Sequence, residues 1–499
     1  MVEAGAQERI RQVIDLHFEW LLVPDDGNSF PINCTEIDII DRDEKVLFGF
    51  VDDRGYHAWR LNDFSEAENG LKLDLAGAFG RKRTQFRLVP RTSARELAEE
   101  IEAARLLQAN DIARGLRDAE FCKTVTRVAL SRDNARVAEI FFRSADDAAA
   151  AIADVSRSIT SEMLLSIAIL RWEALSSRKK DRIETLWIIA EKKQARDLQS
   201  LHAMLSRMRK RSIRIAEIER RPDTIRIKEL RPKRLSDLWR GRTKPLSLPD
   251  DPTPSSVARE ILAMAPQEID VIFSRQGETL RFRGLPFARV RKTLGVEKGW
   301  FGVDRRKKVF GPESKIEMEA LIDELRLYRR SDPENPRHEF YRLAPEAWLE
   351  SILRRNIKLL DANIILSPIY NQFRASNDRI DLLALRRDGR LVIVELKTSP
   401  DREMIFQAAD YWRKIELQRR RGKLQDSDLF AGREIIDKPA LIYLAAPAWS
   451  FHAEFAHFAR MIDPEVEIWR FELHENWRRE VKVVARQNYS DPLSGFTNL

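Results

Sequence analysis

Three ionisable residues in the last third of the chain have the types and the spacing needed to hydrolyse a phosphodiester. Asp381 begins the segment DLLAL, and Glu395 and Lys397 end the segment LVIVELK. Two carboxylates are hard oxygen ligands, the kind that Mg²⁺ or Mn²⁺ prefers. A metal ion held there would polarise a phosphate and lower the pKa of a bound water, and the backbone carbonyl of Leu396 could add a ligand. Lys397 could position that water and offset the developing negative charge.

The surroundings of these three residues are apolar. Side chains alternate across a strand, so the even-numbered residues of LVIVELK share one face, and all of them are apolar. The odd-numbered face begins apolar and ends in Glu395 and Lys397, and Asp381 likewise precedes Leu383 and Leu385 on one face. A Glu–Lys pair two residues apart usually lies on a solvated strand face. Here the charges lie at the edge of a dry core, where an unpaired charge is costly, so we expect mutual pairing or a bound metal.

The Asp…Glu-x-Lys arrangement resembles the PD-(D/E)xK nuclease superfamily, over residues 345–475. Ile380 stands where the name of that superfamily has proline. The resemblance implies that Asp381 and Glu395 bind the metal. It also implies an additional acidic residue on the preceding helix, for which Glu350 is the expected residue and Glu346 a neighbouring candidate.

A second motif follows the first. Gln407 and Tyr411 are four residues apart, a spacing that places them on one face of a helix. They resemble the Gln-x-x-x-Tyr signature of RecB-type and NucS-type nuclease domains, which implies that both residues support the active site and contact DNA. Ser399-Pro400-Asp401 predicts the start of this helix, with a serine N-cap and a proline in the first turn.

The elements around the motifs follow in a definite order. Residues 345–490 predict a helix, two strands, a tight turn at Asp388-Gly389, a third strand and a helix. A buried strand in KPALIYLAAPAW, a helix and a strand in VEIWRFEL come next. The resemblance implies that these elements form a restriction-endonuclease-like α/β core, a mixed central sheet flanked by helices.

The 499 residues are too many for one ordinary core, and the patterns predict a multidomain protein of α/β and α+β parts. Residues 1–92 alternate as in a β-rich N-terminal domain. Residues 93–244 alternate between helical and strand patterns, with a long helix expected from about Asp146, and they end in a basic part. Residues 257–330 predict a small α+β unit with a basic hairpin, and the nuclease-like domain occupies 345–490.

The charge balance favours an anionic partner. The chain has 87 Lys and Arg against 79 Asp and Glu, a net charge of +8. Two basic segments, residues 207–244 and residues 281–308, could follow a phosphate backbone. A solvated basic face is an equally good interpretation of the first segment. The residues expected to contact DNA are Arg209, Lys210, Arg211, Arg283, Arg289 and Arg291. The aromatic residues of the second segment, Phe287, Trp300 and Phe301, are expected to form the core of the hairpin unit.

Several classes of protein are disfavoured. Cys34 and Cys122 are the only cysteines, which suits a reducing cytosol and offers neither a disulfide framework nor a zinc cluster. No signal peptide or membrane span is expected, and no phosphate-binding or dinucleotide glycine motif occurs. A second Asp…Glu-x-Lys set, at Asp181, Glu191 and Lys193, lacks the hairpin turn and more simply indicates an ordinary strand.

These patterns predict a cytoplasmic, metal-dependent DNA nuclease that uses Mg²⁺ or Mn²⁺ and acts in repair or anti-phage defence. DNA is favoured over RNA only because the resembling families cut DNA. Two alternatives stay open: an inactive nuclease-like module that binds DNA or protein, and an RNA-processing nuclease. A homodimer or a protein partner is compatible with the sequence.

Overall fold

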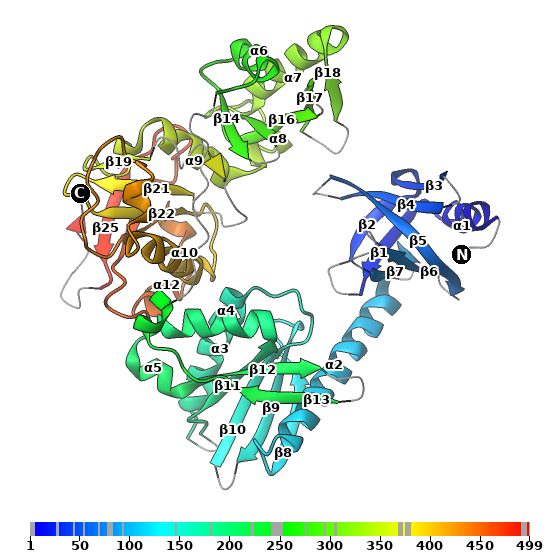
Figure 1. Ribbon diagram of the computed structural model, residues 1–499, viewed down its shortest axis with the longest axis vertical. Helices are drawn as coiled ribbons and strands as arrows, with labels where there is room; N and C mark the ends of the chain where they lie inside the picture. Colours follow the sequence, from blue (N-terminus) through cyan, green and yellow to red (C-terminus); the bar gives the residue numbers. More distant parts are fainter. Residues whose placement is uncertain are drawn as a thin grey trace. The chain divides into compact units, whose positions relative to one another are not determined.

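A computed structural model describes residues 5–490 and 497–498 with short gaps. The gaps are 26–28, 43–44, 53–54, 68–69, 77–82, 92–93, 145–146, 180–181, 221–223, 241–252, 275–276, 294–295, 304–306, 368–372 and 375–380. The chain is a multidomain α/β protein, and its described residues form four β-sheets (Figure 1). It divides into two compact units, Met1–Leu198 with Ser212–Arg231, and Gln199–Arg211 with Pro232–Leu499.

The boundary between the two units does not fall at residue 244, the expected end of the second domain. Residues 199–211 and those from 232 onward pack with the C-terminal part of the chain. The amide of Ser206 donates to the carbonyl of Met461 at 2.7 Å, and the amide of Asp463 donates to the carbonyl of Met204 at 2.8 Å. These contacts are far apart in sequence, so local composition could not show them.

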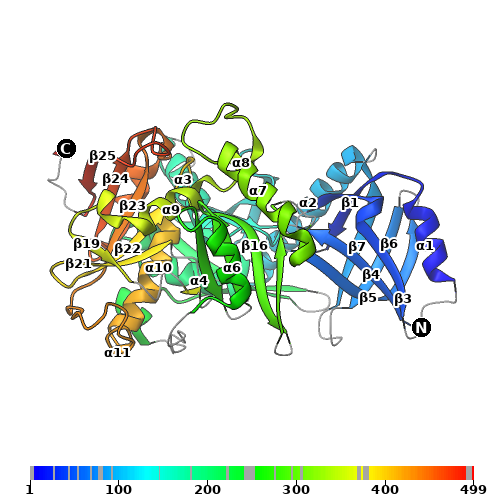
Figure 2. The same cartoon turned by 90° about the horizontal axis from the view of Figure 1, so that it is seen from above.

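The first sheet has seven antiparallel strands in the order β2-β1-β7-β6-β5-β4-β3, in the region where a β-rich segment was expected. Helix α1 (Ala6–Ile14) lies against β3 and β6 (Figure 2) and buries Ile10 and Ile14 in the same core as Trp20 and Phe48. The strands are β1 (Glu19–Pro24), β2 (Phe30–Asn33), β3 (Ile37–Arg42), β4 (Lys45–Asp52), β5 (Gly55–Ala67), β6 (Gly70–Ala76) and β7 (Arg83–Pro90).

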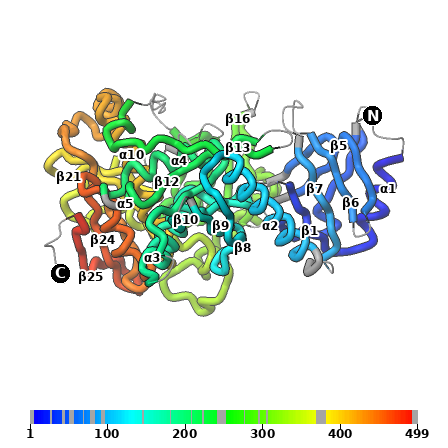
Figure 3. The backbone as a smooth tube through the Cα atoms, turned by 90° about the horizontal axis from the view of Figure 1, so that it is seen from below, coloured from blue at the N-terminus to red at the C-terminus, as the bar shows by residue number. Residues whose placement is uncertain are grey.

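The second sheet has six strands in the order β13-β12-β11-β10-β9-β8, with β10, β11 and β12 parallel. Helix α2 (Ala94–Asp118) packs along it against β8, β9 and β13 (Figure 3). The strands are β8 (Thr124–Leu130), β9 (Val137–Ser144), β10 (Asp147–Asp154), β11 (Leu186–Glu191), β12 (Ile213–Arg220) and β13 (Ile225–Glu229). The other helices are α3 (Ser161–Ser176), α4 (Lys192–Ala203) and α5 (Arg207–Ser212).

The long helix expected from Asp146 is wrong at its start. The alanine-rich run DAAAAIAD is strand β10, which pairs with β9 on one side and β11 on the other. Alanine has the highest intrinsic helix propensity, but a central strand buried on both faces also accepts small apolar side chains. The helix α3 begins only at Ser161, where the side chain of Thr160 caps it.

The third sheet belongs to the second unit and has the order β18-β17-β16-β15-β14-β20. Phe287 and Phe301 are buried in its core, as expected, whereas Trp300 is half-buried. The strands are β14 (Ile269–Ser274), β15 (Gly277–Phe282), β16 (Leu285–Thr293), β17 (Val296–Phe301), β18 (Lys308–Phe310) and β20 (Phe373–Arg374). The helices are α6 (Ser256–Met264), α7 (Lys315–Tyr328) and α8 (Glu339–Arg342).

The fourth sheet is mixed, with the order β19-β21-β22-β23-β24-β25-β26, in which β22, β23 and β24 are parallel. The predicted turn joins β21 and β22, and Gly389 adopts a φ of 83° there. The strands are β19 (Ile364–Leu366), β21 (Leu382–Arg386), β22 (Leu391–Leu396), β23 (Leu441–Pro447), β24 (Ile468–Leu473), β25 (Val483–Asn488) and β26 (Thr497–Asn498). The helices are α9 (Pro345–Arg355), α10 (Met404–Arg419), α11 (Lys423–Asp426) and α12 (Phe455–Ala459).

The order of elements predicted for this region is therefore confirmed, with a shorter helix at α12 than the sequence indicated. Helices α9 and α10 both pack against β22. The even-numbered residues of β22 lie in one core with Leu349 and Leu353 of α9, which confirms the predicted division of the strand into two faces.

Candidate functional site

The three charged residues of the first motif meet where β21 begins and β22 ends. The antiparallel register pairs Leu382 with Val394, so Asp381, one residue before β21, stands opposite Glu395. The carboxylate of Asp381 accepts a hydrogen bond from the backbone amide of Leu396 at 2.8 Å. Nζ of Lys397 lies 3.5 Å from Oε1 of Glu395. The structure thus brings the predicted acids and lysine together.

Glu395 is deeply buried, with only 3% of its surface exposed. Its Oε2 atom has no hydrogen-bond partner among the residues that the structure describes. A buried carboxylate oxygen without a partner is costly, because it loses its hydration without replacement. A cation bound to Oε2 of Glu395 would therefore offset this desolvation cost.

The electrostatics of the pair point in the same direction. Burial, and then the nearby charge of Glu350, raise the pKa of Asp381 to about 7. Burial and the charge of Asp381 raise the pKa of Glu395 well above its usual value. For Lys397, burial lowers the pKa, but the carboxylates of Glu395 and Asp401 outweigh it and hold the pKa above the usual value. Two acids that resist ionising together, beside a fixed ammonium group, are typical of a site that receives a cation.

Asp401 is a site residue that the sequence interpretation missed. Its Oδ2 lies 2.9 Å from Nζ of Lys397, and its Oδ1 accepts the amide of Glu403 at 2.7 Å. The helix predicted to start at Ser399 begins instead at Met404. The N-cap interpretation was therefore wrong, because Asp401 turns the chain ahead of the helix and holds Lys397. The lysine is fixed between two carboxylates.

Helix α9 brings a second buried cluster to the edge of the site. Glu350 accepts hydrogen bonds from Nη1 of Arg281 at 3.1 Å and from Nη1 of Arg354 at 3.3 Å. Arg281 also donates to Asp270 at 2.5 Å. Both oxygens of Glu350, the expected additional metal-site residue, are thus engaged by arginines. Its neighbour Glu346 is half-buried, and its charge acts on the pKa of Asp381, Glu395 and Lys397.

Arg281 comes from β15, so the third sheet reaches the site. Strand β20, in the segment between β19 and β21, pairs in parallel with β14 and is the edge strand of that sheet. The chain between β19 and β21 of the fourth sheet therefore contributes Phe373 and Arg374 to the third sheet. Sequence alone gave no sign of this, because Arg281 and Glu350 are 69 residues apart.

The residues present fit a hydrated divalent cation. Two carboxylates converge, one with a buried oxygen that lacks a partner. Within the described ranges, no group of three or more His, Cys, Asp or Glu side chains is arranged to hold a metal. Mg²⁺ is compatible with so small a set, since it retains several waters and commonly takes only one or two carboxylates from the protein. The role of the Leu396 carbonyl as a ligand stays a prediction.

The second motif lies on α10, as expected. Gln407 and Tyr411 are half-buried on this helix, which packs against β22 and β23. Nζ of Lys414 lies 5.8 Å from the centre of the Tyr411 ring. Their support of the acids and their contact with DNA stay predictions.

The basic candidates differ in their availability. Arg289 and Arg291 are exposed on one face of β16, where Trp300 and Lys298 pair with them across the ladder. Burial and the charge of Arg291 lower the pKa of Arg289, which indicates crowded positive charge. This strand face therefore presents arginines, a lysine and an aromatic ring together.

Arg283 and Lys210 already have protein partners. Arg283 donates to the carbonyl of Arg329 at 2.9 Å, and Lys210 lies 3.8 Å from Asp463. Arg209 is half-buried and Arg211 is exposed at the end of α5. Contact of all four residues with DNA stays a prediction. Arg283 and Lys210 also make contacts within the protein.

The described residues of the second Asp…Glu-x-Lys set do not indicate a second site. Asp181 lies outside the described residues. Glu191 ends β11 and pairs with Arg220 at 2.7 Å. Both described cysteines carry free thiols, and no helix in the described part of the chain is long and apolar enough to cross a membrane.

Comparison with protein-family models, with curated proteins and with solved structures gives no match to this chain.

Proposed function

We propose that this protein is a metal-dependent nuclease that hydrolyses phosphodiester bonds of DNA, with a restriction-endonuclease-like core in residues 345–490. One observation carries the proposal: a buried Glu395 with a partnerless oxygen stands opposite Asp381 and 3.5 Å from the ammonium of Lys397. The mixed sheet with α9 and α10 against β22 supports it, as does the exposed basic face of β16 in the same compact unit.

Each side chain of the site has a distinct task in this proposal. Asp381 and Glu395 would hold one Mg²⁺ or Mn²⁺ ion, and Glu346 of α9, whose charge acts on both acids, would assist them. The bound ion would polarise the scissile phosphate and lower the pKa of a coordinated water. Lys397 remains protonated, orients the attacking water and neutralises charge that develops on the phosphate. Asp401 fixes the lysine in place.

DNA is proposed as the substrate on the strength of the family resemblance, with repair or anti-phage defence as the setting. The exposed arginines of β16 suit any phosphate backbone, because phosphate contacts position a nucleic acid without selecting its sequence. An RNA-processing nuclease is the second candidate, and it predicts the same metal site with the opposite substrate preference.

The test is a cleavage assay with Mg²⁺ and with Mn²⁺ on linear, nicked, flapped and single-stranded DNA and on matched RNA. We expect metal-dependent cleavage of DNA by the wild type and its loss in Glu395→Gln and in Lys397→Ala. Lys315→Ala is the matched control, since Lys315 is an exposed lysine on α7 that pairs with Glu260 at 3.4 Å.

Two results would point elsewhere. Cleavage that survives in Glu395→Gln would remove the proposed site from the reaction. Tight DNA binding without cleavage by any form, together with no metal binding in calorimetry, would make the inactive nuclease-like module the better account.

A further inference from the structure

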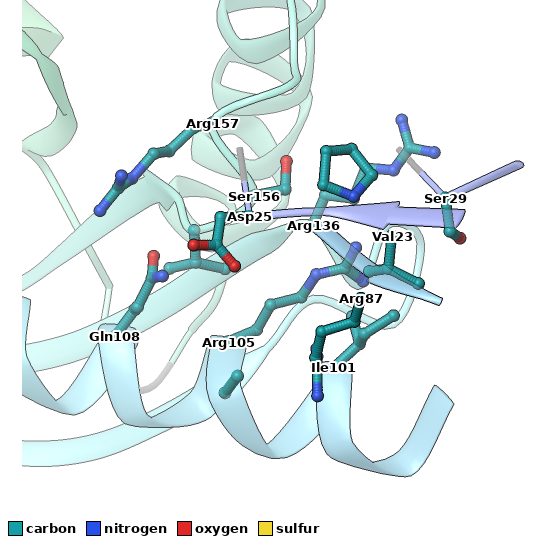
Figure 4. Close-up of a pocket in the computed structure, with 13 residues that line it drawn as sticks. Val23, Asp25, Ser29, Arg87, Ile101, Arg105, Gln108, Arg136, Ser156 and Arg157 are labelled. Carbon is teal, nitrogen blue, oxygen red and sulfur yellow. The ribbon is translucent and has the colours of Figure 1, made fainter. Parts of the chain in front are cut away.

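A cavity of about 310 Å³ lies in the first unit, far along the chain from the acids described above. Its walls come from the end of β1 and the residues after it, from β7, from α2, from the loop before β9 that carries Arg136, and from the loop that follows β10 (Figure 4). That volume is at the lower end of the range typical of small-molecule sites, so it suits one small ligand better than a polymer.

The cavity is strongly cationic. Arg87, Arg105, Arg136 and Arg157 line it. Arg87 is paired with Glu100 at 2.7 Å, and Arg157 is 4.0 Å from Glu191. Among the ion pairs of the described residues, none involves Arg105 or Arg136.

Arg105 and Arg136 act on each other. Burial lowers the pKa of Arg105 and the neighbouring charge of Arg136 lowers it further, while the charges of Asp154 and Glu102 raise it. Two half-buried guanidinium groups that act on each other in this way repel, at a cost to the fold. An anion between the two groups would remove that cost, and a phosphate matches the planar fork of each guanidinium.

The loop after β10 is built rigidly against this cavity. Asp154, at the carboxyl end of the strand, accepts the amides of Ser156 at 2.8 Å and Arg157 at 2.9 Å, and the hydroxyl of Ser156 at 2.9 Å. Arg157 adopts a left-handed φ of 55°, which a non-glycine residue keeps only when its surroundings enforce it. β10 is followed by parallel strands β11 and β12, and α/β sheets bind ligands beyond the carboxyl ends of such strands.

The remaining walls are complementary to the rest of a nucleotide. Val23, Pro24 and Ile101 provide an apolar surface, and the carboxylate of Asp25 lines the same cavity. Oε1 of Gln108 is buried and has no hydrogen-bond partner within the described ranges. Asp25 and Gln108 thus offer acceptors for the hydroxyl and amino groups that a nucleotide carries in addition to its phosphate.

We propose that this pocket binds a nucleotide, with Arg105 and Arg136 on its phosphate and with Asp25 and Gln108 accepting from its sugar hydroxyls or base amino group. The site is separate from the proposed nuclease centre and does not depend on cleavage. The same phosphomonoester could belong to a free nucleotide or to the terminal nucleotide of a strand, and the cavity volume favours the free molecule.

The experiment is isothermal calorimetry on the full chain with four probes: inorganic phosphate, the nucleoside 5′-monophosphates, the corresponding triphosphates, and a short oligonucleotide with or without a 5′-phosphate. We expect Arg105→Gln and Arg136→Gln each to weaken binding about tenfold or more, because each removes a charge-assisted contact. The matched control is Arg114→Gln, on the same helix, where the side chain is 65% exposed and paired with Asp111. It should bind within about twofold of the wild type.

A second variant locates the ligand within the pocket. Gln108→Leu should weaken nucleotide binding and leave inorganic phosphate binding unchanged, since Gln108 faces the nucleoside part in this arrangement. Arg105→Lys keeps the charge and loses the fork, so its affinity should fall between those of the wild type and Arg105→Gln. Circular-dichroism melting verifies that each variant is folded.

The outcomes separate cleanly. Binding of free nucleotides supports the proposal as stated, and binding only of the 5′-phosphorylated oligonucleotide assigns the phosphate to a strand end. No binding of any probe at millimolar concentration would overturn the proposal, as would an equal loss in Arg114→Gln. Glu395→Gln should retain full nucleotide binding, so failure of the nuclease proposal leaves this result untouched.

Discussion

The cluster that joins the third sheet to α9 predicts a large effect for one substitution. Arg281→Met removes the guanidinium that contacts both Glu350 and Asp270 while keeping most of the side-chain volume. The side chains of Arg281 and Glu350 are only 4% and 5% exposed, so solvent cannot replace the lost partner. Glu350 would then be a poorly compensated buried charge beside Asp381.

The magnitude follows from what stays behind. Removing one partner of a buried ion pair costs about 3–5 kcal/mol. Arg354 still contacts Glu350 at 3.3 Å, and Asp270 is partly exposed, so we expect the lower end, about 3 kcal/mol. Replacing both partners, in Arg281→Met with Glu350→Leu, should recover most of this loss, because no buried charge is then stranded.

Hydrogen exchange measured by mass spectrometry is the suitable assay, because the chain has two compact units and a single unfolding midpoint would mix them. A loss of about 3 kcal/mol corresponds to roughly 100-fold faster exchange in peptides of α9 and β15. Arg326→Met is the control, since its pair with Asp323 has side chains 42% and 72% exposed and should contribute less than about 1 kcal/mol.

Two results would refute the reasoning. If Arg281→Met left exchange in α9 unchanged, the cluster would not stabilise the junction between the two sheets. If the double substitution were as destabilised as the single one, the loss would come from packing and not from a stranded carboxylate.

Three further predictions concern the same unit. A Cβ at Gly284 would lie 1.9 Å from the carbonyl oxygen of Ala347, whereas a Cβ at Gly422, which has a similar φ, would meet open space. Gly284→Ala should therefore lower the free energy of unfolding several-fold more than Gly422→Ala, as measured by urea unfolding. Asp401→Asn should lower kcat with little change in KM and leave metal binding in calorimetry intact, because it loosens only the lysine. With EDTA present, the free energy of unfolding should fall as pH rises from about 4 through 7, because folding raises the pKa of Asp381 from 3.8 to about 7. Asp381→Asn should flatten that dependence in denaturation series measured at several pH values.

The candidate site was predictable because its signal is local. Alternation within LVIVELK and the Asp388-Gly389 turn determine which side chains reach the end of β22, and both were confirmed. The strand β10 was not predictable in this way, since DAAAAIAD favours a helix until its two neighbouring strands are known. Ile380, the departure from the family pattern, lies outside the described residues.

The residues that contact the site, Arg281 and Asp401, were not predictable. Arg281 is distant in sequence, and the local pattern assigned Asp401 to a helix instead of to the site. Arg281 lies in the unit of residues 257–330 that was expected to carry a basic hairpin, yet it is buried and reaches α9. Asp401 looked like a residue of the first helical turn, yet it binds Lys397. The sequence shows that charged residues occur in strands, but the three-dimensional fold is needed to determine which of them are buried.

The geometry of the second unit explains why α9 matters to the acids. Strand β15 carries Arg281 to Glu350, and its neighbour β16 exposes Arg289 and Arg291. Strand β20, at Phe373–Arg374, also pairs with β14 of the same sheet. The basic strand face and the acidic pair are thus connected through the third sheet and the buried ion pair of Arg281 with Glu350. Glu350, although it is paired with Arg281 and Arg354, still raises the pKa of Asp381, whereas the charge of Glu346 acts on Asp381, Glu395 and Lys397 alike, so both acids of α9 bear on the site.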